Sequence, residues 1–122
     1  MPRARRSPPL LENLETLSFV LRLKPGAEAE YRRRHDELWP EMRTLLLESG
    51  IVHYEISLHP STNMLFAFIV RRLDHTMDRI PDHPVGRRWR AHMADILETV
   101  EGIVPRVEPL ARMFVLSAGD KK

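Results

Sequence analysis

The sequence predicts an α+β fold whose elements follow the order β-α-β-β-α-β. Two periodicities support this class. Apolar and polar residues alternate from residue 52 to 59, which is the period of a half-buried strand. From residue 31 to 45 apolar residues recur every three or four positions, which is the period of a helix. With 122 residues, the chain is long enough for one hydrophobic core and too short for two.

The first strand is expected at about residues 15–23, which alternate in polarity. Residues 24–26, Lys-Pro-Gly, end this strand, and a helix follows from about Ala27. Pro40 has no amide hydrogen to donate inside a helix, so it is expected to start a second helical segment. That segment should end near Gly50, because glycine readily adopts the left-handed conformation that caps helices.

The second strand covers residues 52–59. Its alternation puts Val52, Tyr54, Ile56 and Leu58 on one face and His53, Glu55, Ser57 and His59 on the other. Residues 60–63 read as a turn, and residues 64–70 form a strand that is apolar on both faces. Asp74 is expected to cap a short helix that Pro81 closes.

Pro84 is expected to open a longer helix. Its apolar positions at helical spacing are Val85, Trp89, Met93, Ile96 and Val100. Residues 110–116 then form a last strand. This order is the split βαβ, or ferredoxin-like, arrangement, in which two helices cover one face of four antiparallel strands. The other face stays uncovered although it carries large apolar residues, so we expect a homodimer in which a second copy covers it.

The ends of the chain differ from its middle. Residues 1–13, rich in proline and arginine, are expected to form a flexible N-terminal tail. Residues 14–118 form the single ferredoxin-fold domain, and residues 119–122 are a C-terminal tail. We expect a cytoplasmic protein, because no segment resembles a secretory signal and the longest apolar run, residues 64–70, cannot span a bilayer.

The composition argues against several classes of partner. There is no cysteine, so disulfides, thiolate zinc sites and cysteine nucleophiles are excluded. Nineteen basic residues oppose seventeen acidic ones in alternating clusters, which favours solvated helix faces over a nucleic-acid interface. The six histidines include no short-spaced pair on one face, so no metal is expected. Phosphate loops and dinucleotide motifs are missing too, so no cofactor is expected.

Four residues are candidates for chemistry. Tyr31 and His35 are four residues apart and therefore share the apolar face of the first helix. By phase, Tyr54 and Trp89 also point between the helices and the sheet, where apolar walls with a few polar groups typically bind small molecules. An imidazole there can transfer protons near neutral pH. The alternative is that these side chains are ordinary core aromatics and that His35 bonds a backbone carbonyl.

The residues also resemble a known family, the L-rhamnose mutarotases. The resemblance is carried by residues 31–41 (Tyr-Arg-Arg-Arg-His-Asp-Glu-Leu-Trp-Pro-Glu), 53–58, 63–67 and 88–89, and it extends over residues 15–116. It implies a cytoplasmic homodimer of ferredoxin-like subunits, a dimeric α/β barrel. Such proteins interconvert the α and β anomers of L-rhamnose without a cofactor.

Carried over by position, the resemblance implies that His35 is the general acid and that Tyr31, Tyr54, Trp89 and Arg90 bind the sugar. The family pattern has a second tryptophan where this chain has Arg90, which bears on the identity of the sugar. Two other readings stay open. One is a mutarotase for another deoxy sugar such as L-fucose, and the other is a dimeric α/β barrel that binds a small molecule or acts as a cofactor-independent oxygenase.

Overall fold

The computed structural model describes residues 12–118. Most of the expected N-terminal tail and the expected C-terminal tail, residues 1–11 and 119–122, lie outside this range. The elements in chain order are β1 (Leu14–Arg22), α1 (Glu28–Asp36), α2 (Pro40–Glu48), β2 (Ile51–His59), β3 (Met64–Arg72), the 3₁₀ helix η2 (Met77–Asp82), α3 (Pro84–Met93), β4 (Thr99–Glu101), β5 (Val104–Pro105) and β6 (Glu108–Pro109).

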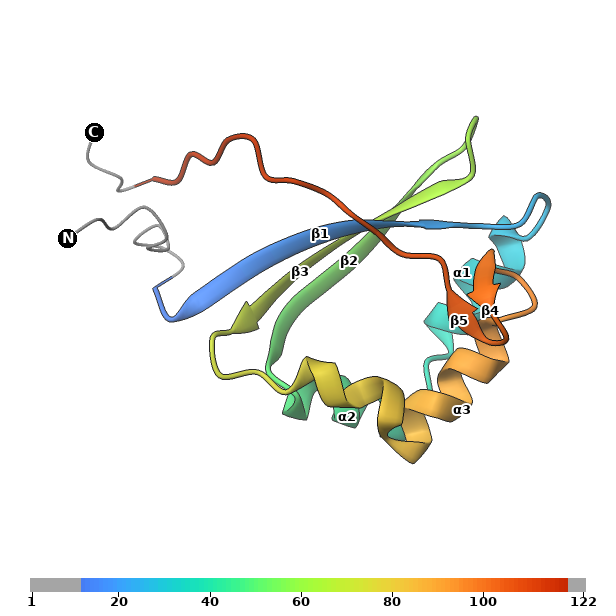
Figure 1. The fold of residues 1–122 in the computed structure, drawn as a ribbon, viewed down its shortest axis with the longest axis horizontal. Helices are drawn as coiled ribbons and strands as arrows, with labels where there is room; N and C mark the ends of the chain where they lie inside the picture. Colours follow the sequence, from blue (N-terminus) through green and yellow to red (C-terminus); the bar gives the residue numbers. More distant parts are fainter. Residues whose placement is uncertain (1–11, 119–122) are drawn as a thin grey trace.

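The main sheet confirms the ferredoxin-like prediction. Its strand order is β2-β3-β1-β6, and every neighbouring pair is antiparallel. Helices α1, α2 and α3 lie on one side of the sheet, below it in Figure 1, as the helices of a split βαβ fold should.

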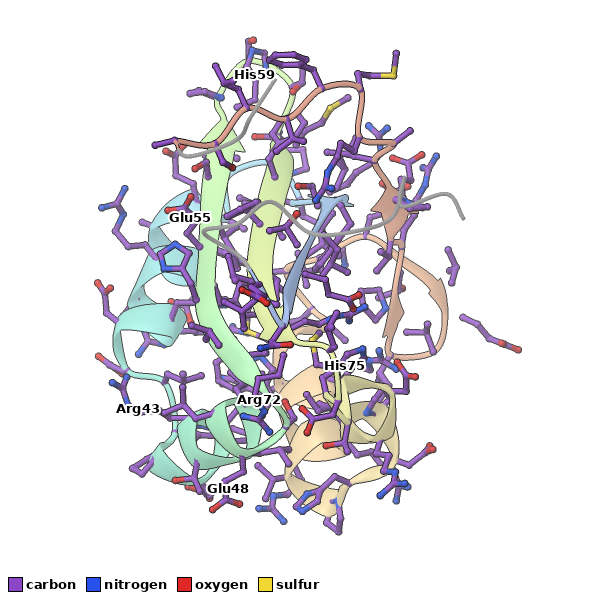
Figure 2. The ribbon with its side chains drawn as sticks, turned by 90° about the vertical axis from the view of Figure 1, so that its left-hand side faces the viewer. Arg43, Glu48, Glu55, His59, Arg72 and His75 are labelled. Atoms are coloured by element: carbon purple, nitrogen blue, oxygen red, sulfur yellow. The ribbon has the colours of Figure 1, made fainter. Side chains whose placement is uncertain are left out.

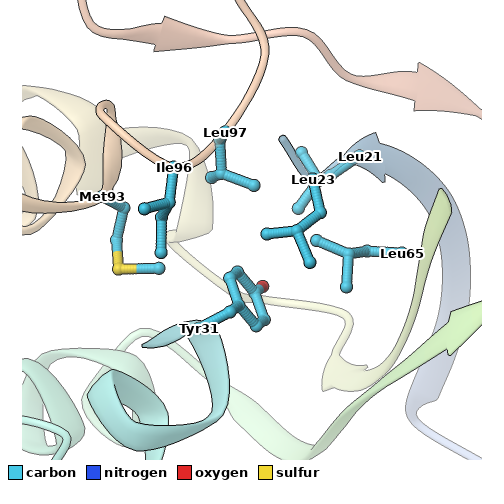
Figure 3. Packing of buried hydrophobic residues seen from close by; sticks show 7 residues of the cluster. All are labelled: Leu21, Leu23, Tyr31, Leu65, Met93, Ile96 and Leu97. Carbon is cyan, nitrogen blue, oxygen red and sulfur yellow. The ribbon is translucent and has the colours of Figure 1, made fainter. Parts of the chain in front are cut away.

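The core fills part of the space between the helices and the sheet. The residue pairs Leu21–Leu65 and Leu58–Leu65 are in register across the three long strands, so these leucines share the helix-facing side. The buried cluster consists of Leu21, Leu23, Tyr31, Leu65, Met93, Ile96 and Leu97. Figure 3 shows the ring of Tyr31 among these aliphatic side chains. Alternate residues of the first strand segment, Leu21 and Leu23, therefore face the helices, with Phe19 packed against the same cluster.

The helical region is interrupted before Pro40, as the sequence predicts. Helix α1 ends at Asp36, and Pro40 occupies the first turn of α2, where its missing amide hydrogen has no intrahelical acceptor. The carbonyl oxygen of Trp39 accepts the amide hydrogens of Met42 and Arg43 at 3.0 and 2.9 Å. After α2, Gly50 takes a φ of +112°, and a Cβ there would lie 2.9 Å from that of His75. The break places His35 in the last turn of α1.

The C-terminal third differs from the prediction. Helix α3 ends at Met93 and does not continue to Val100, which lies in the short strand β4 and is 65% exposed. Ile96 and Leu97 still reach the core, because the chain turns and pairs with the end of β1: the amide of Lys24 donates to the carbonyl of Ile96 at 2.9 Å. Backbone pairing with a strand replaces the helix here.

The last strand is also displaced. Instead of residues 110–116, only Glu108–Pro109 pairs with β1, opposite Phe19 and Val20. One further bond follows, from the amide of Leu110 to the carbonyl of Ser18 at 3.0 Å. Pro109 has no amide hydrogen for the ladder, which shortens the pairing. Beyond it the segment, red in Figure 1, crosses the strands and extends away from the helices.

Two local predictions around the hairpin strands were wrong. Val52 is 55% exposed and Ile51 is buried, because the pairing of β2 with β3 shifts register between Ile51 and His53. Asp74 does not cap the following helix. Its carboxylate accepts from Arg72 Nε at 3.1 Å, and Thr76 occupies the N-cap position of η2 without a side-chain bond.

The sheet face away from the helices and the C-terminal segment expose apolar side chains. Phe66 on β3 is 38% exposed, and in the segment after β6 the exposures reach 90% at Met113 and 79% at Phe114. In Figure 2, His59 lies at one end of the strands and Arg72 and His75 lie toward the other. Within residues 12–118 no helix is long and apolar enough to cross a membrane.

Candidate active site

A cleft of about 1070 Å³ lies between the helices and the sheet. Its walls come from β1, β2 and β3 on one side and from all three α-helices and η2 on the other. All five predicted site residues line it: Tyr31, His35, Tyr54, Trp89 and Arg90. The lining is mainly apolar with a few polar groups, which is the usual character of small-molecule sites.

The rings of Tyr31, His35 and Trp89 form the centre of this site. The centroids of Tyr31 and His35 are 4.3 Å apart with the rings inclined by 33°, which follows from their spacing of four residues on α1. Trp89 comes from α3 and stands edge-on to the imidazole, at 5.5 Å and 89°. The predicted meeting of these side chains is therefore present in the structure.

The hydrogen bonding of His35 determines which nitrogen faces the cleft. Its Nδ1 lies 3.1 Å from the carbonyl oxygen of Tyr31. A carbonyl can only accept, so Nδ1 carries a hydrogen and donates it, as the alternative reading from the sequence expected. Nε2 has no partner among residues 12–118 and is left for exchange with a ligand. The bond to the backbone thus orients the imidazole and does not exclude a chemical role.

Burial makes His35 a weaker base. The loss of hydration lowers the pKa of His35 below its usual 6.5, and this outweighs the hydrogen bond to the Tyr31 carbonyl and the charge of Asp36, which both raise it. A histidine whose pKa lies below neutrality is mainly uncharged at pH 7 but is easily protonated. Both forms are therefore accessible during a reaction cycle.

Two phenol hydroxyls in the cleft are free to bond a ligand. Burial raises the pKa of Tyr54 to about 12, and burial together with the nearby Tyr54 raises the pKa of Tyr31. Both hydroxyls are consequently protonated at neutral pH. Neither has a hydrogen-bond partner among the residues that the structure describes, although buried hydroxyls in proteins normally have one. This is the arrangement expected where ligand hydroxyls complete the bonding.

An ion-pair network fixes the end of α1 that carries His35. Arg34 Nη1 donates to Asp95 Oδ1 at 2.8 Å and to the carbonyl oxygen of His92 at 2.6 Å, so α1 is bound to the C-terminal end of α3. On its other side Arg34 Nε donates to Glu30 at 2.6 Å. Hydrogen bonds from Arg33 and Arg34 lower the pKa of Glu30 to about 2. The network holds the helices that carry His35 and Trp89 together.

The sequence reasoning did not predict two aromatic neighbours of Trp89. The ring of Trp39 stands edge-on to Trp89 at 5.1 Å and 88°. His92 lies 5.2 Å from Trp39 and 5.5 Å from Trp89. The signal for His92 was available, since residues three apart on a helix are neighbours. Trp39 and His92 thus brace the indole that contacts His35.

Arg90 lines the same cleft from the next position on α3. It is half-buried and has no hydrogen bond or ion pair with any of residues 12–118. The histidines do not gather: within the described part of the chain no three of His, Asp or Glu are placed to share a metal ion. The five predicted residues thus bring one imidazole, two phenols, one indole and one guanidinium to the cleft, whose lining also includes the charged residues Glu28, Arg32, Asp36 and Arg43.

The fold defines a class, the small ferredoxin-like proteins with helices on one face of an antiparallel sheet. A solved structure from Mycobacterium tuberculosis that shares only 20% of its residues has the same fold, with a TM-score of 0.53. The family model of the L-rhamnose mutarotases matches residues 16–116. The chain therefore belongs to the L-rhamnose mutarotase family, whose members are isomerases.

Individual relatives agree with this assignment. The L-rhamnose mutarotase of Jannaschia sp. is 48% identical over 83% of this chain and 97% of its own length. That of Rhizobium leguminosarum bv. trifolii is 50% identical over 83% of this chain and 95% of its own. The crystal structure of L-rhamnose mutarotase from Formosa agariphila superposes with a TM-score of 0.77 at 33% identity, covering 84% of this chain and 99% of that one.

Proposed function

We propose that this protein interconverts the α and β anomers of L-rhamnose. The observation that carries the proposal is the set of unpaired groups in the cleft: Nε2 of His35 and the hydroxyls of Tyr31 and Tyr54 have no partners among the described residues. These groups can donate and accept hydrogen bonds, which the hydroxyls of a pyranose need. The names of the relatives support L-rhamnose as the sugar.

Mutarotation requires two proton transfers. The ring oxygen gains a proton while the anomeric hydroxyl loses one to a water molecule, so the C1–O5 bond breaks and the aldehyde forms. Rotation about C1–C2 and the reverse transfers close the ring with the other configuration. We assign delivery of the proton to the ring oxygen to Nε2 of protonated His35, and neutral His35 takes it back during closure. Its depressed pKa keeps the neutral form available for this second step.

The other side chains position the sugar. Hydroxyls of Tyr31 and Tyr54 bond the ring substituents, and the indole of Trp89 packs against the apolar side of the 6-deoxy sugar near its methyl group. Trp39 and His92 hold that indole in place from behind. General acid–base catalysis of this kind contributes typically about 10² to 10⁴ in rate.

Magnetisation transfer between the anomeric proton signals of L-rhamnose tests the proposal. The intact protein should accelerate exchange, and His35→Ala should lose about 10² or more of that acceleration. His59→Ala is the matched control, because His59 is exposed, bonds Thr62 and does not line the cleft. Full activity of His35→Ala would remove the proton-donor role. If neither L-rhamnose nor L-fucose exchanges faster, the site belongs to a binding protein.

We also propose that the protein is a cytoplasmic homodimer whose residues 14–118 form one domain. Support for the dimer comes from exposed apolar groups that a monomer leaves in water: Phe66 on the open sheet face, and Met113, Phe114 and Leu116 in the segment beyond β6. A second copy related by a two-fold axis would cover both regions at once.

A further inference from the structure

Arg90 is a half-buried arginine without a counterion. Among residues 12–118, five arginines are half-buried. Four of them pair with carboxylates: Arg22 with Glu108 at 2.9 Å, Arg34 with Asp95 at 2.8 Å, Arg71 with Glu15 at 2.7 Å and Arg106 with Glu98 at 3.0 Å. Arg90 makes no such pair although it lines the cleft. The chain therefore neutralises its other partly buried guanidinium groups and leaves this one open.

The cleft itself supplies little negative charge to Arg90. Its carboxylates are Glu28 and Asp36 on α1, both exposed and neither within ion-pair distance of Arg90. A partly desolvated cation is unfavourable unless an anion or several acceptors approach it. A guanidinium presents planar, paired donors that match the two oxygens of a carboxylate. An anionic ligand would satisfy Arg90 better than a neutral one.

The geometry indicates which part of a sugar Arg90 meets. Arg90 follows Trp89 on α3, and both residues line the cleft. The indole is 5.5 Å from the imidazole of His35. In the proposed binding mode Trp89 packs near the methyl group at C6, so the C6 substituent lies in the part of the cleft that Trp89 and Arg90 line.

We propose that Arg90 makes this cleft a site for hexuronates, aldoses that carry a carboxylate at C6, in addition to a neutral 6-deoxy sugar. The guanidinium binds the C6 carboxylate, and His35 catalyses ring opening as it does for L-rhamnose. No new bond chemistry is needed, because the C6 group takes no part in mutarotation. This inference rests on the proposed function.

Three sugars of the same ring configuration test it, because they differ only at C6: L-rhamnose carries a methyl group, L-mannose a hydroxymethyl group and L-mannuronate a carboxylate. Anomeric exchange is measured by magnetisation transfer for each, and the rate without protein is subtracted. The intact protein should accelerate L-mannuronate with a higher kcat/KM than L-mannose. Arg90→Gln should lower the ratio of these two values roughly 10- to 100-fold, as expected for a charge-assisted pair.

Two further variants sharpen the result. Arg90→Lys keeps the charge but loses the paired donors, so its ratio should lie between those of the intact protein and Arg90→Gln. Arg87→Gln is the control, because it removes the same charge from an exposed position of α3 that does not line the cleft. Its ratio should equal that of the intact protein. Circular dichroism of each variant verifies that it folds.

Each outcome decides the question. Acceleration of L-rhamnose without acceleration of L-mannuronate overturns the hexuronate inference and leaves the proposed function standing. An equal loss for all three sugars in Arg90→Gln also overturns it, because Arg90 would then act on hydroxyls that the sugars share. If no sugar exchanges faster with the intact protein, the proposed function fails together with this inference.

Discussion

Replacing Gly86 by alanine should separate α3 from η2 and thereby disturb the site. Gly86 is buried in α3, and a Cβ built on it would lie 2.0 Å from the carbonyl oxygen of Ile80 and 3.0 Å from its Cγ2. Ordinary contact begins at 3.4 Å, so the two helices must move apart by about 1.4 Å. The obstacle is backbone, which cannot rotate away as a side chain tip can.

The magnitude follows from two opposing terms. Overpacking costs about 1 to 3 kcal/mol, whereas alanine gains about 1 kcal/mol over glycine inside a helix. We expect a net loss of up to about 2 kcal/mol in the free energy of unfolding, which lowers the melting temperature by up to roughly 15 °C. Since α3 also carries Trp89, a displacement of this size should reduce catalysed exchange up to about 10²-fold.

The assays are thermal unfolding by circular dichroism and anomeric exchange by magnetisation transfer. Arg87→Ala is the control, because it lies beside Gly86 on α3 and is exposed, with one 3.3 Å hydrogen bond to the carbonyl of Asp82. Its stability should change by no more than about 0.5 kcal/mol. If Gly86→Ala is instead more stable than the parent, helix propensity outweighs the contact with Ile80 and the packing argument is refuted.

Two more predictions concern the proton donor and the dimer. Burial lowers the pKa of His35 below 6.5, and above its pKa the protonated fraction of His35 falls about tenfold per pH unit. The rate of anomeric exchange should fall in the same proportion if protonated His35 is the acid. A rate that rises with pH would instead assign the base role to His35. The double substitution of Met113 and Phe114 by serine should shift a sedimenting dimer toward monomer, while serine at Val100, exposed on β4, should not. A monomeric parent protein at micromolar concentration would contradict the dimer.

Much of the fold follows from local features of the sequence. Alternation over β2, the glycines and prolines at the turns, and the position of Pro40 specify the order of elements, because each acts over a few residues. The pairing of Tyr31 with His35 on one face was equally predictable, since helix geometry alone brings residues four apart together. The part of the site on α1, Tyr31 and His35, could therefore be predicted from the sequence.

The placement of Trp89 and Trp39 in the site was decided by the tertiary structure alone. The contact of Trp89 with His35 and the bracing by Trp39 depend on how α3 packs on α1 and α2, and no local periodicity encodes that distance. The end of α3 and the place of the last strand were decided by β1 and the residue that follows it, because Leu23 pairs with Leu97 and β1 pairs with Glu108–Pro109. Local patterns specify which conformation a segment favours, but a strand needs a distant partner, and the partner selects which residues pair.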